Sequence, residues 1–200
     1  MSIFELLEGQ LGQTEVHEIS QKVGAEPGAV QSVLQAGLPL LMSGLAKNAA
    51  KPDGAQSILS ALDRDHDGGV LDDVTGFLGQ VDPQVGQGIL GHVLGRQTGQ
   101  VEQQLGNRAG VDPGSVGQIL SMVAPLVMGA LGKQKRERDL DAGGLATMLE
   151  GERQQAMKKR PEAQSMISSL LDRDGDGSMV DDVAEMGLNA LSGFLKGRKR

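Results

Sequence analysis

The chain has 200 residues with 26 acidic and 19 basic side chains, which gives a formal net charge of −7 at pH 7. This length is sufficient for one compact domain or two small ones with a sizeable hydrophobic core. The sequence contains no Cys, Trp or Tyr and only three Phe, so aliphatic side chains must fill that core. The lack of cysteine excludes disulfides, thiolate metal sites and cysteine nucleophiles.

The N-terminal segment "MSIFELLEGQLG" does not resemble a signal peptide, because Glu5 and Glu8 stand where an apolar core would be needed. The longest apolar stretch, "AGLPLLMSGLA", contains Pro39 and is far shorter than the roughly 20 residues that span a bilayer. The absence of cysteine agrees with a reducing compartment. The sequence therefore predicts a soluble, cytoplasmic protein with no transmembrane segment.

Apolar residues follow a helical spacing along the chain. In "EVHEISQKVG" they recur every three or four residues, and Gly24 follows in the position of a helix C-cap. In "VDPGSVGQILSMV", Asp112 is expected to be the N-cap of a helix that begins at Pro113, and Asp82 starts "VDPQVGQGILG" in the same way. No stretch alternates with a period of two residues, so we predict an all-α fold.

The sequence contains an internal repeat. A shift of 86 residues aligns residues 2–47 with residues 88–133 without a gap, and twelve of the aligned pairs are identical. Pro39 and Pro125 form one of these pairs, and each is expected to begin or kink a further helix. The repeat predicts a duplicated helical unit.

We place the two tandem units at residues 1–80 and 81–200. Each unit is expected to end in an acidic loop, at residues 63–74 and 172–183. The second unit contains a basic insertion at residues 133–160, which is expected to be a linker or an additional helix around "GGLATMLEGERQQAMKK".

The chain contains 30 glycines, an unusual number for a helical protein. Several recur four residues apart beside leucine, as Gly91 and Gly95 do in "GILGHVLG". Glycine costs about 1 kcal/mol relative to alanine in an exposed helix interior, so a compensating role is expected. Close packing of helices inside the protein is the favoured interpretation, and a self-association surface is the alternative.

The two acidic loops, "DRDHDGGVLDDV" and "DRDGDGSMVDDV", have aspartates at positions 1, 3 and 5 and a glycine at position 6. This half of the pattern resembles the EF-hand calcium loop, in which alternate oxygens converge on a hard cation and residue 7 offers its carbonyl. The predicted ligands are Asp63, Asp65, Asp67, Gly69 and Asp73 in the first loop and Asp172, Asp174, Asp176, Ser178 and Asp182 in the second. Calcium is the predicted ion, and magnesium is the alternative.

The second half of each loop departs from the EF-hand, because Val74 and Val183 stand where a bidentate Glu is expected. Asp73 and Asp182 are therefore expected to close the two sites. Their neighbours Asp72 and Asp181 are rivals for this role, or place negative charge at a helix N-terminus. His66 at position 4 is expected to point outward. Solvated acidic turns that cap helices are the alternative interpretation of both loops.

Other motifs give little support for catalysis. The histidines His17, His66 and His92 have no metal-ligand spacing, and "GQGILG" follows a helix start where a dinucleotide site needs a strand. The C-terminal "GLNALSGFLKGRKR" places Leu188, Leu191 and Leu195 at helical spacing, with Phe194 beside them and four basic residues at the end. This stripe is expected to pack on the core, and binding to an acidic surface is the alternative.

The segments "GAEPGAVQSVLQAGLPLLMSGLAKNA" and "DRDGDGSMVDDV", with the motifs G-x-x-P-G and APL in order, resemble the bacterial family catalogued as domain of unknown function 937, a relative of the YidB-like proteins. The resemblance covers roughly residues 2–185 and implies a bacterial, helical, intracellular protein without an activity that can be transferred. Comparison of YidB-like proteins with homeodomain-like folds raises the possibility of nucleic-acid binding. Residues 1–100 carry twelve acids against five Lys or Arg, which weighs against it.

The sequence therefore predicts a non-enzymatic helical protein that binds calcium, or a similar divalent cation, through two EF-hand-like loops. Its role is expected to be structural or self-associating, with a second copy or another protein as partner. A homeodomain-like nucleic-acid-binding module that uses the basic insertion and the C-terminal tail is the alternative, and nucleic acid is the less favoured partner.

Overall fold

The computed structural model describes residues 2–51 and 53–159, which form nine α-helices and two short 3-10 helices without a β-strand. The described part of the chain is therefore all-α, as the sequence predicts. The elements in chain order are α1 (Ile3–Gln10), α2 (Gln13–Val23), α3 (Pro27–Ala49), α4 (Gly54–Asp65), η1 (Gly69–Leu71), α5 (Val74–Gln80), α6 (Pro83–Val93), η2 (Gly95–Gln97), α7 (Thr98–Ala109), α8 (Pro113–Arg138) and α9 (Ala142–Lys159).

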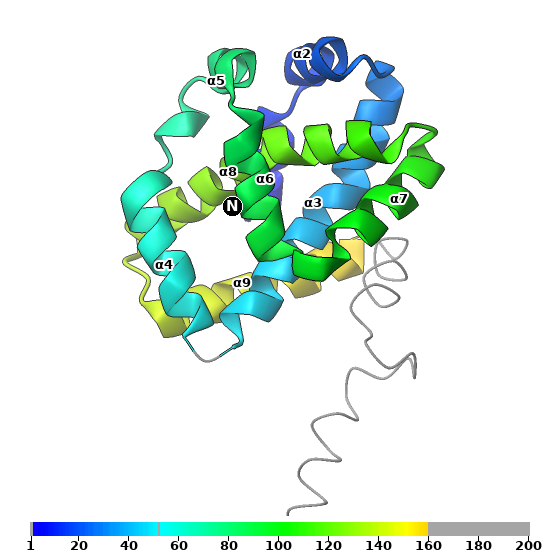
Figure 1. The fold of residues 1–200 in the computed structure, drawn as a ribbon. Helices are drawn as coiled ribbons and strands as arrows, with labels where there is room; N and C mark the ends of the chain where they lie inside the picture. The colour runs from blue at the N-terminus through cyan, green and yellow to red at the C-terminus, as the bar shows by residue number, and fades with distance from the viewer. Residues whose placement is uncertain (1, 52, 160–200) are drawn as a thin grey trace, which may run out of the picture.

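The two longest helices, α3 and α8, lie in the interior of the bundle, with α4 on one side, α7 on the other, α2 and α5 at one end and α9 at the other (Figure 1). Every residue is buried in two long stretches, residues 36–46 of α3 and residues 119–132 of α8. A helix that is apolar on all sides is typical of a core position. Pro39 and Pro125 lie inside these helices, so of the two expected roles, to begin or to kink a helix, neither proline has the first.

Both α3 and α8 are long and apolar enough to cross a membrane by length and composition. In each helix, however, 78% of the apolar window is buried inside the fold. Because neighbouring helices already cover these faces, packing within the described residues is sufficient to explain their apolar character.

Caps and apolar faces follow the sequence closely. Helix α2 ends at Val23, and the left-handed φ of 67° at the following Gly24 is the expected C-cap geometry. Helix α8 begins at Pro113, and Asp112 accepts a hydrogen bond of 2.9 Å from the Ser115 amide. The face of α8 predicted to be buried is buried, and it comprises Val116, Ile119, Leu120 and Val123. Local capping and periodicity therefore position these helices as predicted.

Helices separated by 86 residues share one boundary each. Helix α7 ends with the C-cap Gly110, whose φ is 73°, as α2 ends with the C-cap Gly24, and α8 begins at Pro113 as α3 begins at Pro27. These helices do not form separate cores. Helix α8 packs against α1, α2 and α4, and a single hydrophobic cluster contains side chains from both halves of the described chain.

The basic insertion at residues 133–160 supplies the last turns of α8 and the additional helix α9. Helix α9 packs mainly on α3, and its Leu145 and Leu149 are wholly buried. The buried carboxylate of Glu152 accepts hydrogen bonds from the amides of Ile3, at 3.1 Å, and Phe4, at 3.3 Å. A helix N-terminus leaves backbone donors without intrahelical partners, so Glu152 satisfies two donors of α1 and joins the insertion to the start of the chain.

We predict that Glu152→Gln lowers the free energy of unfolding by about 1.5–3 kcal/mol, because the substitution removes the charge and one of the two accepting oxygens. Glu150→Gln is the matched control on the same helix. Glu150 pairs with Arg153 at 2.7 Å near the surface, with the two side chains 44% and 21% exposed, and such a pair contributes at most about 1 kcal/mol. Chemical denaturation of both variants measures the difference, and equal losses would contradict the capping role.

Candidate functional site

The first acidic loop, residues 63–74, joins α4 to α5 and lies against α8. Helix α4 continues to Asp65, and Gly68 then turns the chain with a left-handed φ of 98°. A Cβ at Gly68 would lie 3.1 Å from the carbonyl oxygen of Gly129 in α8. Glycine is therefore required here both for the turn and for the close approach of the two backbones.

The loop packs closely against α8 at two glycines of that helix, Gly129 and Gly132. A Cβ at Gly132 would lie 1.8 Å from the carbonyl oxygen of His66, and a Cβ at Gly129 would lie 2.3 Å from the Cγ1 atom of Val70. Any larger residue at Gly132 would meet backbone, which cannot move aside as a side chain can. The close contact with α8 thus fixes the position of the loop and of the last turn of α4.

Basic side chains lie beside three of the four aspartates predicted to bind calcium in the first loop. Lys135 of α8 donates to Asp63, and Arg136 lies 3.5 Å from Asp67. Asp65 pairs with its neighbour Arg64 at 3.2 Å. The aspartate side chains are 60–71% exposed, so each pair contributes at most about 1 kcal/mol. The pairs therefore offset the negative charge of the loop but contribute little to holding it in place.

Hydrogen bonds within the loop use the remaining predicted ligands of the first site. Asp67 accepts from the amide of Gly69 at 3.0 Å, and the Gly69 carbonyl accepts from the amide of Asp72 at 3.1 Å. Asp73 is the N-cap of α5 and accepts from the Gly76 amide at 2.9 Å. Asp73, rather than its exposed neighbour Asp72, therefore makes the capping interaction at the helix start.

The arrangement does not gather these oxygens around one point. Asp63 and Asp65 belong to the last turn of α4, and side chains two residues apart on a helix point to different faces. Among residues 2–51 and 53–159, no three acidic or histidine side chains form a group that could hold a metal ion. Calcium binding stays a prediction. The second loop lies outside the described residues, including Asp172, Asp174, Asp176, Ser178, Asp182 and the rival Asp181.

His66, at position 4 of the loop, follows α4 directly and is half-buried. Burial lowers the pKa of its imidazole below the ordinary value, although the charge of Asp65 opposes the shift. Burial therefore favours the neutral form of the imidazole. Its backbone carbonyl provides the close contact with Gly132, so the part of His66 that matters for packing is the main chain.

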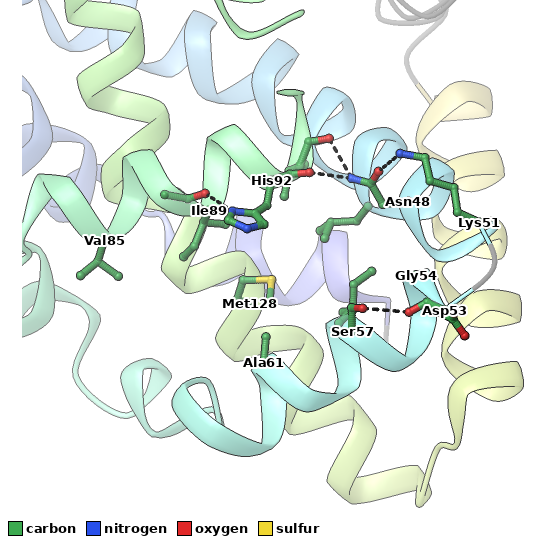
Figure 2. Close-up of a pocket in the computed structure, with 14 residues that line it drawn as sticks. Asn48, Lys51, Asp53, Gly54, Ser57, Ala61, Val85, Ile89, His92 and Met128 are labelled. Carbon is green, nitrogen blue, oxygen red and sulfur yellow. Dashed lines mark hydrogen bonds between the residues drawn. The ribbon is translucent and has the colours of Figure 1, made fainter. Parts of the chain in front are cut away.

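An apolar groove of about 490 Å³ lies between α4 and α6 (Figure 2). The sequence did not indicate this groove, because its walls come from segments more than 20 residues apart and its floor includes Met128 of α8. The lining residues are Leu45, Asn48, Lys51, Asp53, Gly54, Ser57, Ile58, Ala61, Val85, Gly88, Ile89, His92, Val93 and Met128. A concave, largely apolar surface with a few polar groups is the usual form of a binding site.

Polar contacts close one end of the groove. The side-chain amide of Asn48 donates to the carbonyl oxygens of His92, at 2.9 Å, and Val93, at 3.1 Å, at the end of α6. Lys51 donates to the Asn48 side-chain oxygen at 2.6 Å (Figure 2). Asn48 therefore satisfies terminal carbonyls of α6 and joins that helix to the end of α3.

The other end of the groove is open and acidic. Val85 is 51% exposed, and among the described residues it is the one large apolar side chain that is exposed to solvent. It also borders a smaller hollow of about 180 Å³, whose lining includes Asp65, Asp67 and Asp82. The groove thus runs from a closed polar end to an open end near three carboxylates, and Figure 2 shows Val85 and Lys51 at its opposite ends.

A family model described as bacterial protein of unknown function (DUF937) matches residues 5–134. No curated protein and no solved structure matches the chain. The matched range includes loop 63–74 and every residue that lines the groove, whereas Lys135, Arg136 and α9 lie beyond it. The groove is therefore built wholly from the family domain.

We predict that Gly132→Ala lowers the free energy of unfolding by about 1–3 kcal/mol, because the added methyl group collides with the His66 carbonyl. Gly91→Ala is the matched control in α6. A Cβ there meets nothing within 4 Å, so the substitution is expected to raise stability by up to about 1 kcal/mol. Chemical denaturation measures both variants, and a loss of stability in Gly132→Ala with a gain in Gly91→Ala would support the packing described above. A neutral Gly132→Ala would show that the loop can move away from α8.

Proposed function

The chain belongs to a family of bacterial proteins of unknown function (DUF937), and from its geometry we propose that it is a non-enzymatic protein that binds an amphipathic helix in the groove between α4 and α6. The apolar lining of this groove, with Val85 exposed at its open end, is the observation that carries the proposal. A helix bound in a groove places apolar side chains from successive turns against the floor and walls.

The dimensions of the walls agree with such a ligand. Helices α4 and α6 contain 12 and 11 residues, which corresponds to about 16–18 Å at 1.5 Å per residue. A ligand helix of about three turns matches this length and presents three or four apolar residues on one face. The partner is therefore a short amphipathic segment.

Both walls are fixed before any partner arrives. The end of α4 is held by the contact of its loop with Gly132 of α8, as described above. Helix α6 approaches α8 so closely that a Cβ at Gly86 would lie 1.8 Å from the Ser121 carbonyl oxygen. A preformed groove reduces the free energy that binding must spend on ordering the site.

Charge at the open end favours a ligand with basic residues after its apolar stripe. Asp65, Asp67 and Asp82 line the hollow beside Val85. Arg64 and Arg136 lie near the first two carboxylates, but these exposed pairs exchange partners at little cost. Complementary charge of this kind sets the direction of binding and speeds association more than it adds affinity.

Nucleic-acid binding through the basic insertion has weaker support. Lys135 and Arg136 face Asp63 and Asp67, and Arg153 is paired with Glu150. Exposed pairs can exchange partners, so the stronger argument against phosphate recognition is the formal net charge of −7, which repels a polyanion. The proposal of a protein segment as partner therefore takes precedence over the homeodomain-like alternative.

We also infer that the chain is a tandem duplication, which the corresponding ends of α2 and α7 and the corresponding starts of α3 and α8 support. Divalent-cation binding by the two acidic loops is a second candidate function. It is favoured by the position of residues 63–74 between two helices and by the exposure of their aspartates. Calcium is the proposed ion.

The groove predicts that a synthetic amphipathic peptide of about 14 residues, with leucines on one face and lysines at its C-terminal end, perturbs the methyl signals of Ile58, Ile89 and Met128. Val85→Asp is expected to weaken this binding at least about tenfold, since it places a charge beside the apolar stripe. Gln104→Asp, an exposed position on α7, adds the same charge away from the groove and is expected to leave binding unchanged. Equal affinities for both variants would exclude the groove as the site.

The cation candidate predicts heat on titration with calcium, with one event lost in Asp65→Ala and another in Asp174→Ala. Lys135→Gln is expected to raise the calcium affinity of the first loop, because it frees the Asp63 carboxylate from a competing partner. Absence of heat together with an unchanged melting temperature at millimolar calcium would reject this second function.

A further inference from the structure

We propose that the groove between α4 and α6 is occupied by the chain's own C-terminal segment, residues 184–200. The inference rests on the proposed function of the groove and names its partner. It depends on three observations, namely the chemistry of the groove, the amino-acid sequence of this segment and the length of chain between the segment and α9.

The segment has the composition that the groove requires. Leu188, Leu191 and Leu195 recur at spacings of three and four residues, which places them on one face of a helix. Phe194, one of three aromatic residues in the protein, lies beside this stripe. From Leu188 to Leu195 the stripe covers two helical turns, or about 11 Å, within the length of the α4 and α6 walls.

Four basic residues follow the stripe at the end of the chain, Lys196, Arg198, Lys199 and Arg200. If the leucines lie on Met128 and Ile89, these charges reach the open end of the groove, where Asp65, Asp67 and Asp82 line the hollow beside Val85. At the closed end, the charges of Lys51 and Asp53 offset each other. At the open end, Arg64 and Arg136 pair with Asp65 and Asp67, but these exposed pairs exchange partners at little cost, and Asp82 adds a third carboxylate. The acidic end therefore sets the direction in which the segment lies.

The connection between α9 and residues 184–200 is long enough to reach the groove. Residues 160–183 separate the end of α9 from the segment, and 24 residues can span up to about 80 Å when extended. A compact domain of this size is only about 40 Å across. No part of the domain surface is therefore out of reach.

Covalent attachment compensates for the small size of the contact. A flexible connection of this length holds the segment at an effective concentration on the order of 1 mM around the domain. Even a segment that would bind with a Kd on the order of 0.1 mM as a free peptide then occupies the groove most of the time. The C-terminal segment thus covers Val85 and competes with any external partner for the same surface.

The absence of cysteine allows a direct test in the full-length chain. A nitroxide attached at Asn189→Cys is expected to broaden the methyl signals of Ile58, Ile89 and Met128, independently of protein concentration. The additional pair Leu188→Asp and Leu191→Asp is expected to abolish the broadening, because it removes the apolar face. The matched pair Ala190→Asp and Gly193→Asp adds the same charge on the opposite face and is expected to retain it.

Two results overturn the proposal. Methyl signals that stay sharp in the labelled chain mean that the segment does not enter the groove. Broadening seen only when spin-labelled chains are mixed with separate isotope-labelled chains means that a second copy, rather than the same molecule, supplies the segment.

The amphipathic peptide described above separates this inference from the function on which it rests. It is expected to bind the full-length Leu188→Asp, Leu191→Asp variant at least about tenfold more tightly than the natural chain. Equal, measurable binding to both chains overturns the C-terminal occupant and leaves the groove function standing. No binding to either chain overturns the groove function itself.

Discussion

The close approach of backbone to helix α8 is the constraint on which the rest of the structure depends. With only three phenylalanines and no tryptophan or tyrosine, the core cannot be filled by bulky rings. Neighbouring elements are instead brought against α8, at Gly86 beside the Ser121 carbonyl and at Gly132 beside the His66 carbonyl. Because both contacts involve backbone, they fix α6 and the end of α4 relative to the same helix. The groove is the space left between two walls positioned in this way.

Electrostatics has a different role from packing in this region. The aspartates of loop 63–74 are largely exposed, so their pairs with Lys135 and Arg136 add little to stability. Charges near the surface still act over distances of about 8–10 Å at physiological salt. Asp65, Asp67 and Asp82 line the hollow at the open end of the groove, and a basic ligand can replace Arg64 and Arg136 as the partners of the first two. Packing determines where the groove lies, and charge determines which end of a ligand enters first.

The sequence predicts the local features of this fold well and its long-range contacts poorly. Caps such as Asp112 and Gly24 depend on neighbouring residues alone, so pattern reasoning places them correctly. The expected close contacts at Gly91 and Gly95 are absent, since a Cβ at either would meet nothing within 4 Å, and α6 ends at Val93. Glycines can mark helix contacts, but their spacing does not reveal which of them meets a neighbour. For the same reason the aspartate pattern of the loop could not reveal Lys135, which lies 72 residues from Asp63.

The two central helices differ in how their surroundings are completed. Helix α9, which lies beyond the family match, covers α3 with the buried Leu145 and Leu149, and its Glu152 caps α1. The groove over Met128 of α8 has no equivalent helix among the described residues, and Val85 is left 51% exposed there. A helix bound in the groove would remove the apolar lining and Val85 from water, which is favourable. An amphipathic helix in the groove would therefore complete the surface over α8, as α9 completes the surface over α3. The sequence beyond α9 contains a leucine stripe, so the same molecule can supply such a segment.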